Sequence, residues 1–228
     1  MDSSRKTAVT VGVLYIIGTV AGVLSGVVRG DLLDAPDYLN IVASDADRVM
    51  LTALLVLVMG LALAMVPVVF YPVGKRYNQV LATGYIVFRG ALETLTYIAL
   101  VIGWLLLVVV ARQYAVSGAA NASQFSNLGT VLVEARDPII AVQDIVFSLG
   151  ALMFYCLLYQ ARLIPRWISG WGIVGAILML ATGLMWLNTQ LVILLIPLGL
   201  QEMVMAVWLI VKGFDPSVIA AGTARPAN

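Results

Sequence analysis

Long apolar runs alternate with short polar segments along this chain, and the alternation predicts membrane-spanning helices. A helix needs ~20 apolar residues to cross the hydrocarbon core of a bilayer. Six runs reach about that length, at residues 7–28, 49–70, 79–111, 138–161, 168–187 and 191–211. The first is longer than the apolar region of a signal peptide, so we interpret it as a retained helix. We expect an all-α polytopic membrane protein, with one six-helix domain at 1–216 and a flexible cytoplasmic tail at 217–228.

Several details of these runs predict how they are arranged. At ~1.5 Å per residue the third run could reach ~50 Å, so it is expected to tilt or to extend beyond the bilayer. Asp137 followed by Pro138 predicts an N-cap and the first position of the fourth helix. The fifth and sixth runs are separated by residues 188–190 only, which predicts antiparallel neighbours.

The two longer outer loops have apolar residues at helical spacing. In residues 124–135, Phe125, Leu128, Val131 and Leu132 recur on one side of a predicted helix, and residues 37–48 mix apolar side chains with aspartates. We therefore expect short amphipathic helices at the outer interface.

Lysine and arginine positions predict the orientation. Cytoplasmic loops of membrane proteins carry an excess of these residues. One set of predicted helix ends is mainly basic, and the alternate set carries most of the acidic residues. The basic set, which predicts cytoplasmic N- and C-terminal ends, is Arg5, Lys6, Lys75, Arg76, Arg162, Arg166, Lys212 and Arg225.

Composition narrows the functional classes. The chain is 62% hydrophobic and 11% charged, less than half of the ~25% charge typical of soluble domains, and a net charge of +1 gives no reason to expect a nucleic-acid partner. It contains no histidine, which excludes His-ligated haem, HExxH zinc sites and His-based nucleophile pairs. Cys156 is interpreted as a small buried apolar residue. We expect no metal site and no cofactor, and the absence of a nucleophile motif favours a protein that is not an enzyme.

Four charged residues fall inside the apolar runs, where each costs at least ~2.5–3.5 kcal/mol at the centre of an isolated helix. Arg89 and Glu93 are four apart, so they can pair on one helix face. Glu202 is expected near the midplane and Asp144 nearer the outer surface. With their polar neighbours they predict an intramembrane ligand or proton site made of Arg89, Glu93, Asp144, Glu202, Gln143 and Gln201.

The charge balance of this group leaves two interpretations open. Three carboxylates accompany one guanidinium, so at least one carboxyl is expected to hold a proton near neutral pH. In the functional interpretation the group binds a ligand, an ion or a proton. In the structural interpretation Arg89 bridges Glu93 and Glu202 to fix helix packing, and Asp144 reaches water at the outer interface.

Two further features concern the helices themselves. Pro197 lies five residues before Glu202, and it predicts either a hinge or passive bending of the last helix. Gly18, Gly22 and Gly26, together with Gly30, recur every four residues and predict a groove for close packing by another helix.

The chain as a whole resembles a bacterial membrane-protein family, domain of unknown function 4386. The segments YPVGKRYNQVLATGYIVFRGALE, LLYQARLIPRW and LQEMVMAVWLIVKGFDP carry the similarity, which covers about residues 7–216. The resemblance implies a protein of the bacterial inner membrane and supports the multi-pass architecture. It implies no activity, cofactor or catalytic residue.

Three functional hypotheses follow. The leading one is a small-molecule, ion or proton binding, transport or sensing bundle built around the intramembrane charges. The second is an accessory or scaffold subunit that binds a protein partner, or a second copy of itself, through the glycine groove. The third is an enzyme that modifies lipid or isoprenoid substrates.

Overall fold

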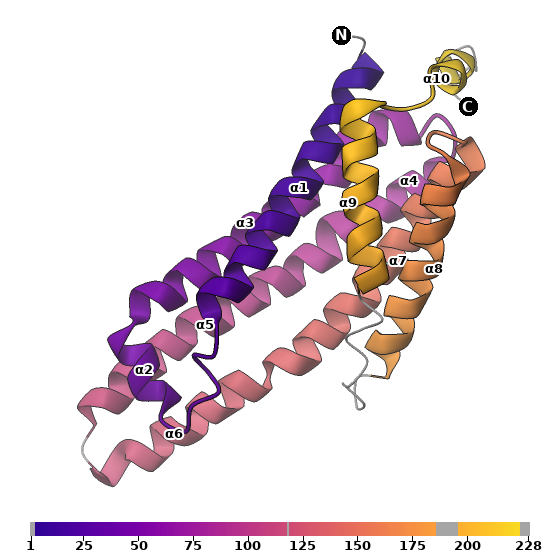
Figure 1. The fold of residues 1–228 in the computed structure, drawn as a ribbon. Helices are drawn as coiled ribbons and strands as arrows, with labels where there is room; N and C mark the ends of the chain where they lie inside the picture. The colour runs from indigo at the N-terminus through magenta and orange to yellow at the C-terminus, as the bar shows by residue number, and fades with distance from the viewer. Residues whose placement is uncertain (1–2, 118, 186–195, 224–228) are drawn as a thin grey trace.

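The computed structural model describes residues 3–117, 119–185 and 196–223, and every regular element within them is a helix (Figure 1). In chain order the helices are α1 (Ser3–Arg29), α2 (Tyr38–Ser44), α3 (Ala46–Gly74), α4 (Gln79–Tyr85), the π-helix η1 (Ile86–Leu92), α5 (Glu93–Val116), α6 (Ala119–Glu134), α7 (Arg136–Ala161), α8 (Arg166–Leu184), α9 (Ile196–Val211) and α10 (Pro216–Thr223).

Five stretches of the described chain are long and apolar enough to cross a membrane. They are Ser3–Arg29, Ala46–Gly74, Gln79–Val116, Asn121–Ala161 and Arg166–Leu184. Helices α9 and α10 qualify together as a sixth, although they are bent by 78° relative to each other. The protein is therefore an all-helical protein with five to six candidate membrane spans. The turn predicted at residues 188–190 lies outside the described residues.

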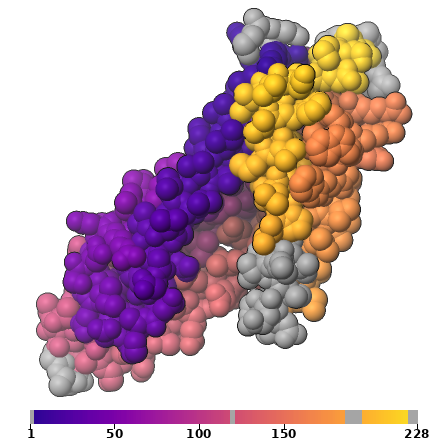
Figure 2. Space-filling model, viewed as in Figure 1, coloured from indigo at the N-terminus to yellow at the C-terminus, as the bar shows by residue number. Residues whose placement is uncertain are grey.

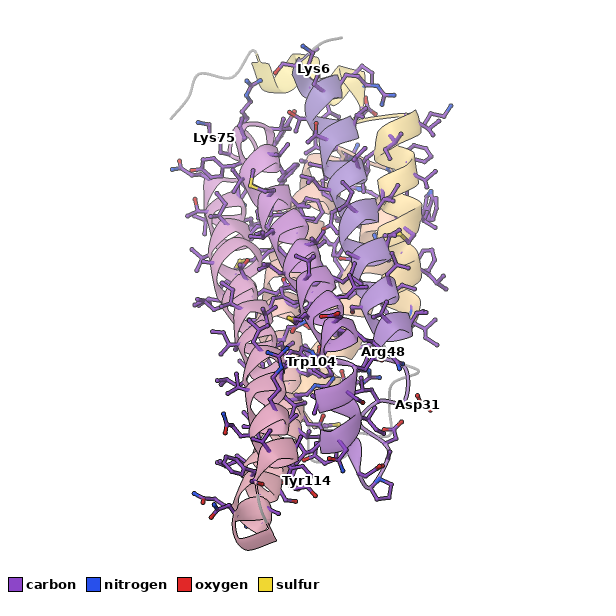
Figure 3. All side chains as sticks on the ribbon, turned by 90° about the vertical axis from the view of Figure 1, so that its left-hand side faces the viewer. Lys6, Asp31, Arg48, Lys75, Trp104 and Tyr114 are labelled. Carbon is purple, nitrogen blue, oxygen red and sulfur yellow. The ribbon has the colours of Figure 1, made fainter. Side chains whose placement is uncertain are left out.

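The start of α1 and the end of α9 meet at one end of the bundle (Figure 1). The Arg5 guanidinium in α1 donates hydrogen bonds to the carbonyls of Leu209, Ile210 and Val211 at the end of α9. Lys6 and Lys75 lie at this same end, and Asp31 and Tyr114 lie at the opposite end (Figure 3). The start of α1 and the end of α9 therefore lie on the same side of the bundle.

The third span is a single long helix with a widened central turn. It runs without a break from Gln79 to Val116, and its residues 86–92 form a π-helix in which the Glu93 N–H donates to the Phe88 carbonyl. The Asn78 side chain accepts from the Leu81 N–H and caps its start. At 38 residues the helix exceeds the ~30 Å hydrocarbon core, as its sequence length predicted.

The far half of α5 is covered by α2 and α6, the helices of the two longer loops. Leu39 and Val42 of α2 belong to one apolar cluster with Trp104, Leu107 and Ala111 of α5, and Leu132 of α6 packs against the same cluster. Both loop segments are thus helical, as the apolar spacing predicted. Their position at a lipid surface stays a prediction.

The prediction that Asp137 caps the fourth helix is wrong. Only Ala135 separates α6 from α7, and its backbone is itself helical, so Asp137 and Pro138 lie inside the first turn of α7. Apolar residues of α6 pack on α5, and this packing keeps the chain helical up to the start of α7.

The prediction of a flexible tail from residue 217 is also wrong for the described residues. Residues 216–223 form α10, and Tyr77 donates a 3.0 Å hydrogen bond to the Val218 carbonyl. The Asp215 N–H donates to the Leu163 carbonyl at 2.9 Å, and Phe214 packs against Phe70. These contacts hold the segment after α9 against the ends of three other helices.

The glycines of α1 allow close packing within the same chain. A Cβ atom added at Gly18 would lie 2.7 Å from Leu63 of α3, and one added at Gly22 would lie 2.6 Å from the Met59 sulfur. At Gly12 it would lie 2.6 Å from the Ala206 carbonyl of α9. Gly26 has nothing of the described chain within 4 Å of that position, so its role in helix packing stays a prediction.

Candidate functional site within the helix bundle

The π-helix places Arg89 in the interior of the bundle. Gly150 of α7 lies so close to this turn that an added Cβ would be 3.1 Å from the Arg89 backbone nitrogen. The Arg89 side chain is 2% exposed. A π-turn inside an α-helix is rare and frequent at functional sites, because the inserted residue changes which side chains face inward.

Arg89 is paired with two carboxylates from different helices. Its Nη1 atom lies 3.1 Å from both carboxylate oxygens of Glu93, and its Nη2 lies 3.4 Å from Glu202 Oε1 on α9. The pair predicted from the four-residue spacing of Arg89 and Glu93 is therefore present. The Arg89–Glu202 contact joins two residues that are 113 positions apart in the sequence.

Aromatic side chains surround the guanidinium. The Arg89 Cζ lies 4.3 Å from the Phe147 ring centroid and 5.7 Å from that of Tyr15. The Tyr15 hydroxyl is hydrogen-bonded to the Tyr85 hydroxyl at 2.9 Å. Ring faces attract a cation, and this attraction grows when water is excluded, so these rings help to stabilise the buried charge.

The two glutamates differ in how many hydrogen bonds they accept. Glu93 is 1% exposed, and it accepts from Arg89 through both oxygens and from the Tyr97 hydroxyl at 3.0 Å. Glu202 is 13% exposed, and only its Oε1 has a partner among the described residues. Arg89 Nε also lacks a hydrogen-bond partner there. Glu202 is thus the carboxylate with capacity left for another group.

A pocket of about 280 Å³ lies beside this ion-pair cluster and is neither sealed nor flat. Polar groups are contributed to its wall by Arg89, Glu202, Gln143, Tyr97 and Thr19. The remaining lining is apolar or glycine: Gly18, Gly22, Val23, Met59, Leu63, Phe147, Met179, Leu198 and Gly199. This combination of an apolar wall and a few convergent polar groups is typical of small-molecule sites.

Of the other predicted site residues, one lines this pocket and two do not. Gln143 lines it, and its Oε1 has no hydrogen-bond partner among the described residues. Gln201 is fully buried and donates to the Ile168 carbonyl of α8 at 3.1 Å, on another side of α9. Asp144 is not part of the lining and forms no ion pair with any described residue.

Helix geometry explains why only one residue of each neighbouring pair reaches the pocket. Successive residues of an α-helix point ~100° apart, whereas residues four apart share a face. Gln143 lies on the face of Phe147, so Asp144 points elsewhere. Glu202 lies on the face of Leu198, so Gln201 points toward α8. The hinge predicted at Pro197 lies at the start of the described part of α9, and the residues before Ile196 lie outside it.

Sequence reasoning missed the tyrosines of the site. Tyr15 lies in the first predicted span, Tyr85 and Tyr97 lie in the third, and aromatic residues in apolar runs are ordinary. The spacing of Tyr97, four residues after Glu93, was the available signal, because it places both on one helix face.

Comparison with known protein families identifies the family of this chain. The model of a family described as domain of unknown function, DUF4386, matches residues 10–213. The chain belongs to this family. The DUF4386 match covers the whole Arg89–Glu93–Glu202 cluster and all the residues that line the pocket. No curated protein and no solved structure shows a significant match to the chain.

Proposed function

We propose that this DUF4386 protein crosses the bacterial inner membrane six times, with both ends of the chain in the cytoplasm. Five described stretches have the length and composition of spans, and α9 is the end of a sixth apolar run. The shared position of α1 and the end of α9 requires an even number of crossings. The excess of lysine and arginine at that end supports its cytoplasmic location.

We further propose that the pocket beside Arg89 binds a small molecule or an ion during transport or sensing. The observation that carries this proposal is Glu202, a partly exposed carboxylate on the wall of the pocket, whose second oxygen has no hydrogen-bond partner among the described residues. Arg89 and Glu93 fix the geometry, and Glu202 is the acceptor for the ligand.

The charges indicate which ligands the site favours. Two carboxylates share one guanidinium, so an additional cation, a proton or a hydrogen-bond donor is attracted to Glu202. The apolar wall formed by Met59, Leu63 and Met179 favours a small ligand with an apolar body. A small lipophilic amine has both features.

Binding of benzylamine to the purified protein tests this proposal. Calorimetry is expected to show binding of benzylamine, and weaker binding of the uncharged benzyl alcohol. Glu202→Gln is expected to weaken benzylamine binding by roughly tenfold, since it removes a charge-assisted contact. Glu134→Gln, a matched change at an exposed residue of α6, is the control. Equal affinity of wild type and Glu202→Gln for benzylamine would rule out Glu202 as the acceptor.

The scaffold hypothesis receives less support from the packing. Gly18 and Gly22, which it assigns to a partner, are already in close contact with Leu63 and Met59 of the same chain. The ligand-binding hypothesis therefore explains more of the described contacts.

A further inference from the structure

A second pocket lies at the basic end of the bundle, away from Glu202. It has a volume of about 490 Å³ and lies where the turn after α7 meets the end of α9. Its lining contains three cations, Arg162, Arg166 and Lys212, all exposed. None of them forms a salt bridge with a carboxylate of the described residues.

The backbone around this pocket is held in place by hydrogen bonds. Arg162 ends α7 in the left-handed conformation, with φ of 55°, and the Leu163 N–H closes the turn onto the Leu158 carbonyl. The Asp215 N–H then joins Leu163 to the segment after α9. The three cations are therefore presented by a fixed turn, and the start of α8 at Pro165 and Arg166 faces the same space without a side-chain cap.

The acidic residue in the pocket lining, Asp215, already accepts hydrogen bonds from a neighbouring residue. Oδ1 of Asp215 accepts from the Ser217 N–H at 2.9 Å and from the Ser217 hydroxyl at 2.6 Å. These bonds keep the pKa of the Asp215 carboxyl below its ordinary value and hold it toward α10. The pocket thus keeps an excess of positive charge, with three cations and one engaged carboxylate.

An apolar groove continues from this pocket along α9. It is lined by Met203, Val204, Val207, Trp208, Val211 and Lys212, with a volume of about 460 Å³. Trp208 and Lys212 belong to both linings, so the basic pocket and the groove are adjacent. Helix α9 lies at the surface of the bundle between α1 and α8, where lipid can reach it (Figure 2).

We propose that an anionic phospholipid binds at this place. Its phosphate lies in the pocket among Arg162, Arg166 and Lys212, its glycerol region lies beside Trp208, and one acyl chain follows the groove along α9. Basic pockets between membrane helices bind anionic headgroups, and tryptophan favours the level of the headgroups. A free phosphate would fill only the basic pocket and would not contact the adjacent apolar groove.

Native mass spectrometry of the full chain in detergent tests this site. Dioleoyl phosphatidylglycerol is expected to bind at least roughly tenfold more tightly than dioleoyl phosphatidylcholine. Each basic residue near a lipid surface contributes about 1 kcal/mol, so Arg166→Gln with Lys212→Gln is expected to weaken phosphatidylglycerol binding by on the order of tenfold to thirtyfold. The matched control is Lys75→Gln with Arg76→Gln, which removes two charges at the same end of the bundle but outside the pocket.

Soluble anions separate the lipid from a free phosphate. Inorganic phosphate and glycerol 3-phosphate are expected not to displace the bound phosphatidylglycerol. Displacement by either anion would identify a site for free phosphate and overturn the proposal. Equal binding of the two lipids to wild type, or an equal loss in the control variant, would also overturn it. The comparison of lipids on wild type holds even if a variant does not fold.

Discussion

Glu93 and Glu202 are the same residue type and contact the same guanidinium, yet their surroundings give them different roles. Glu93 accepts three hydrogen bonds and is 1% exposed, whereas Glu202 accepts one and is 13% exposed. The first is therefore a structural partner of Arg89, and the second is the group that faces the pocket.

Removal of Glu93 is expected to destabilise the protein. Glu93→Ala leaves Arg89 buried with only the longer contact to Glu202, and breaking a buried pair costs ~3–5 kcal/mol. Glu202→Gln keeps a polar side chain and the Arg89–Glu93 pair, so a smaller loss of stability is expected. Thermal unfolding in detergent measures both. A larger loss for Glu202→Gln than for Glu93→Ala would contradict these assignments.

Arg5 is expected to matter for stability despite its position near the start of α1. It donates three hydrogen bonds to the last carbonyls of α9, and bonds from charged groups contribute ~1.5–3 kcal/mol each at most. Arg5→Ala should lower the unfolding temperature by several degrees, while the neighbouring exposed Lys6→Ala should leave it nearly unchanged. Equal effects of the two changes would show that the hydrogen bonds contribute little.

At the scale of the helices, glycines at two positions of α1 have different surroundings. Gly12 faces the Ala206 carbonyl of α9, whereas Gly26 faces open space. Alanine has a higher helix propensity than glycine by ~1 kcal/mol, so Gly26→Ala is expected to be neutral or stabilising. Gly12→Ala must move α1 away from a backbone atom, and a loss of ~1–3 kcal/mol is expected. Unfolding measurements in which both changes have the same sign would contradict this packing.

Helical spacing also explains how much of the site could be predicted. The four-residue interval gave the Arg89–Glu93 pair, and depth along the last apolar run placed Glu202 near it. The same reasoning could not choose between Gln143 and Asp144, or between Gln201 and Glu202, because helix rotation depends on packing against other helices. The π-turn at residues 86–92 had no signal in the hydrophobic pattern, because a widened turn changes the direction of side chains and not their type.

For the molecule as a whole, apolar run length predicted the helices more reliably than the connections between them. The first five predicted spans correspond to candidate membrane-spanning helices of the described residues, since the lengths are dictated by the bilayer, and the described part of the sixth, Ile196–Val211, is helical. The tail and the start of the fourth helix differ from their predictions. Helix α10 is held by a hydrogen bond from Tyr77, and α6 is held by packing against α5. Such contacts are not visible in local sequence.

The proposed orientation leads to a labelling prediction. In a background where Cys156 is replaced by serine, Asp34→Cys lies in the loop between α1 and α2, and Arg76→Cys lies in the loop between α3 and α4. A membrane-impermeant maleimide added to intact cells should label the first cysteine and leave the second unlabelled. Opening the membrane should then allow labelling of both. Labelling of Arg76→Cys in intact cells would reverse the orientation.

The central claim is that an open pocket presents the Glu202 carboxylate inside the bundle. The most direct measurement is the rate at which methanethiosulfonate reagents modify Thr19→Cys, a pocket residue, in the same Cys156→Ser background. The claim predicts that a cationic reagent reacts faster than an anionic one of similar size, and that Glu202→Gln removes this preference. Absence of labelling by both reagents, or an equal rate for both with Glu202 present, would contradict it.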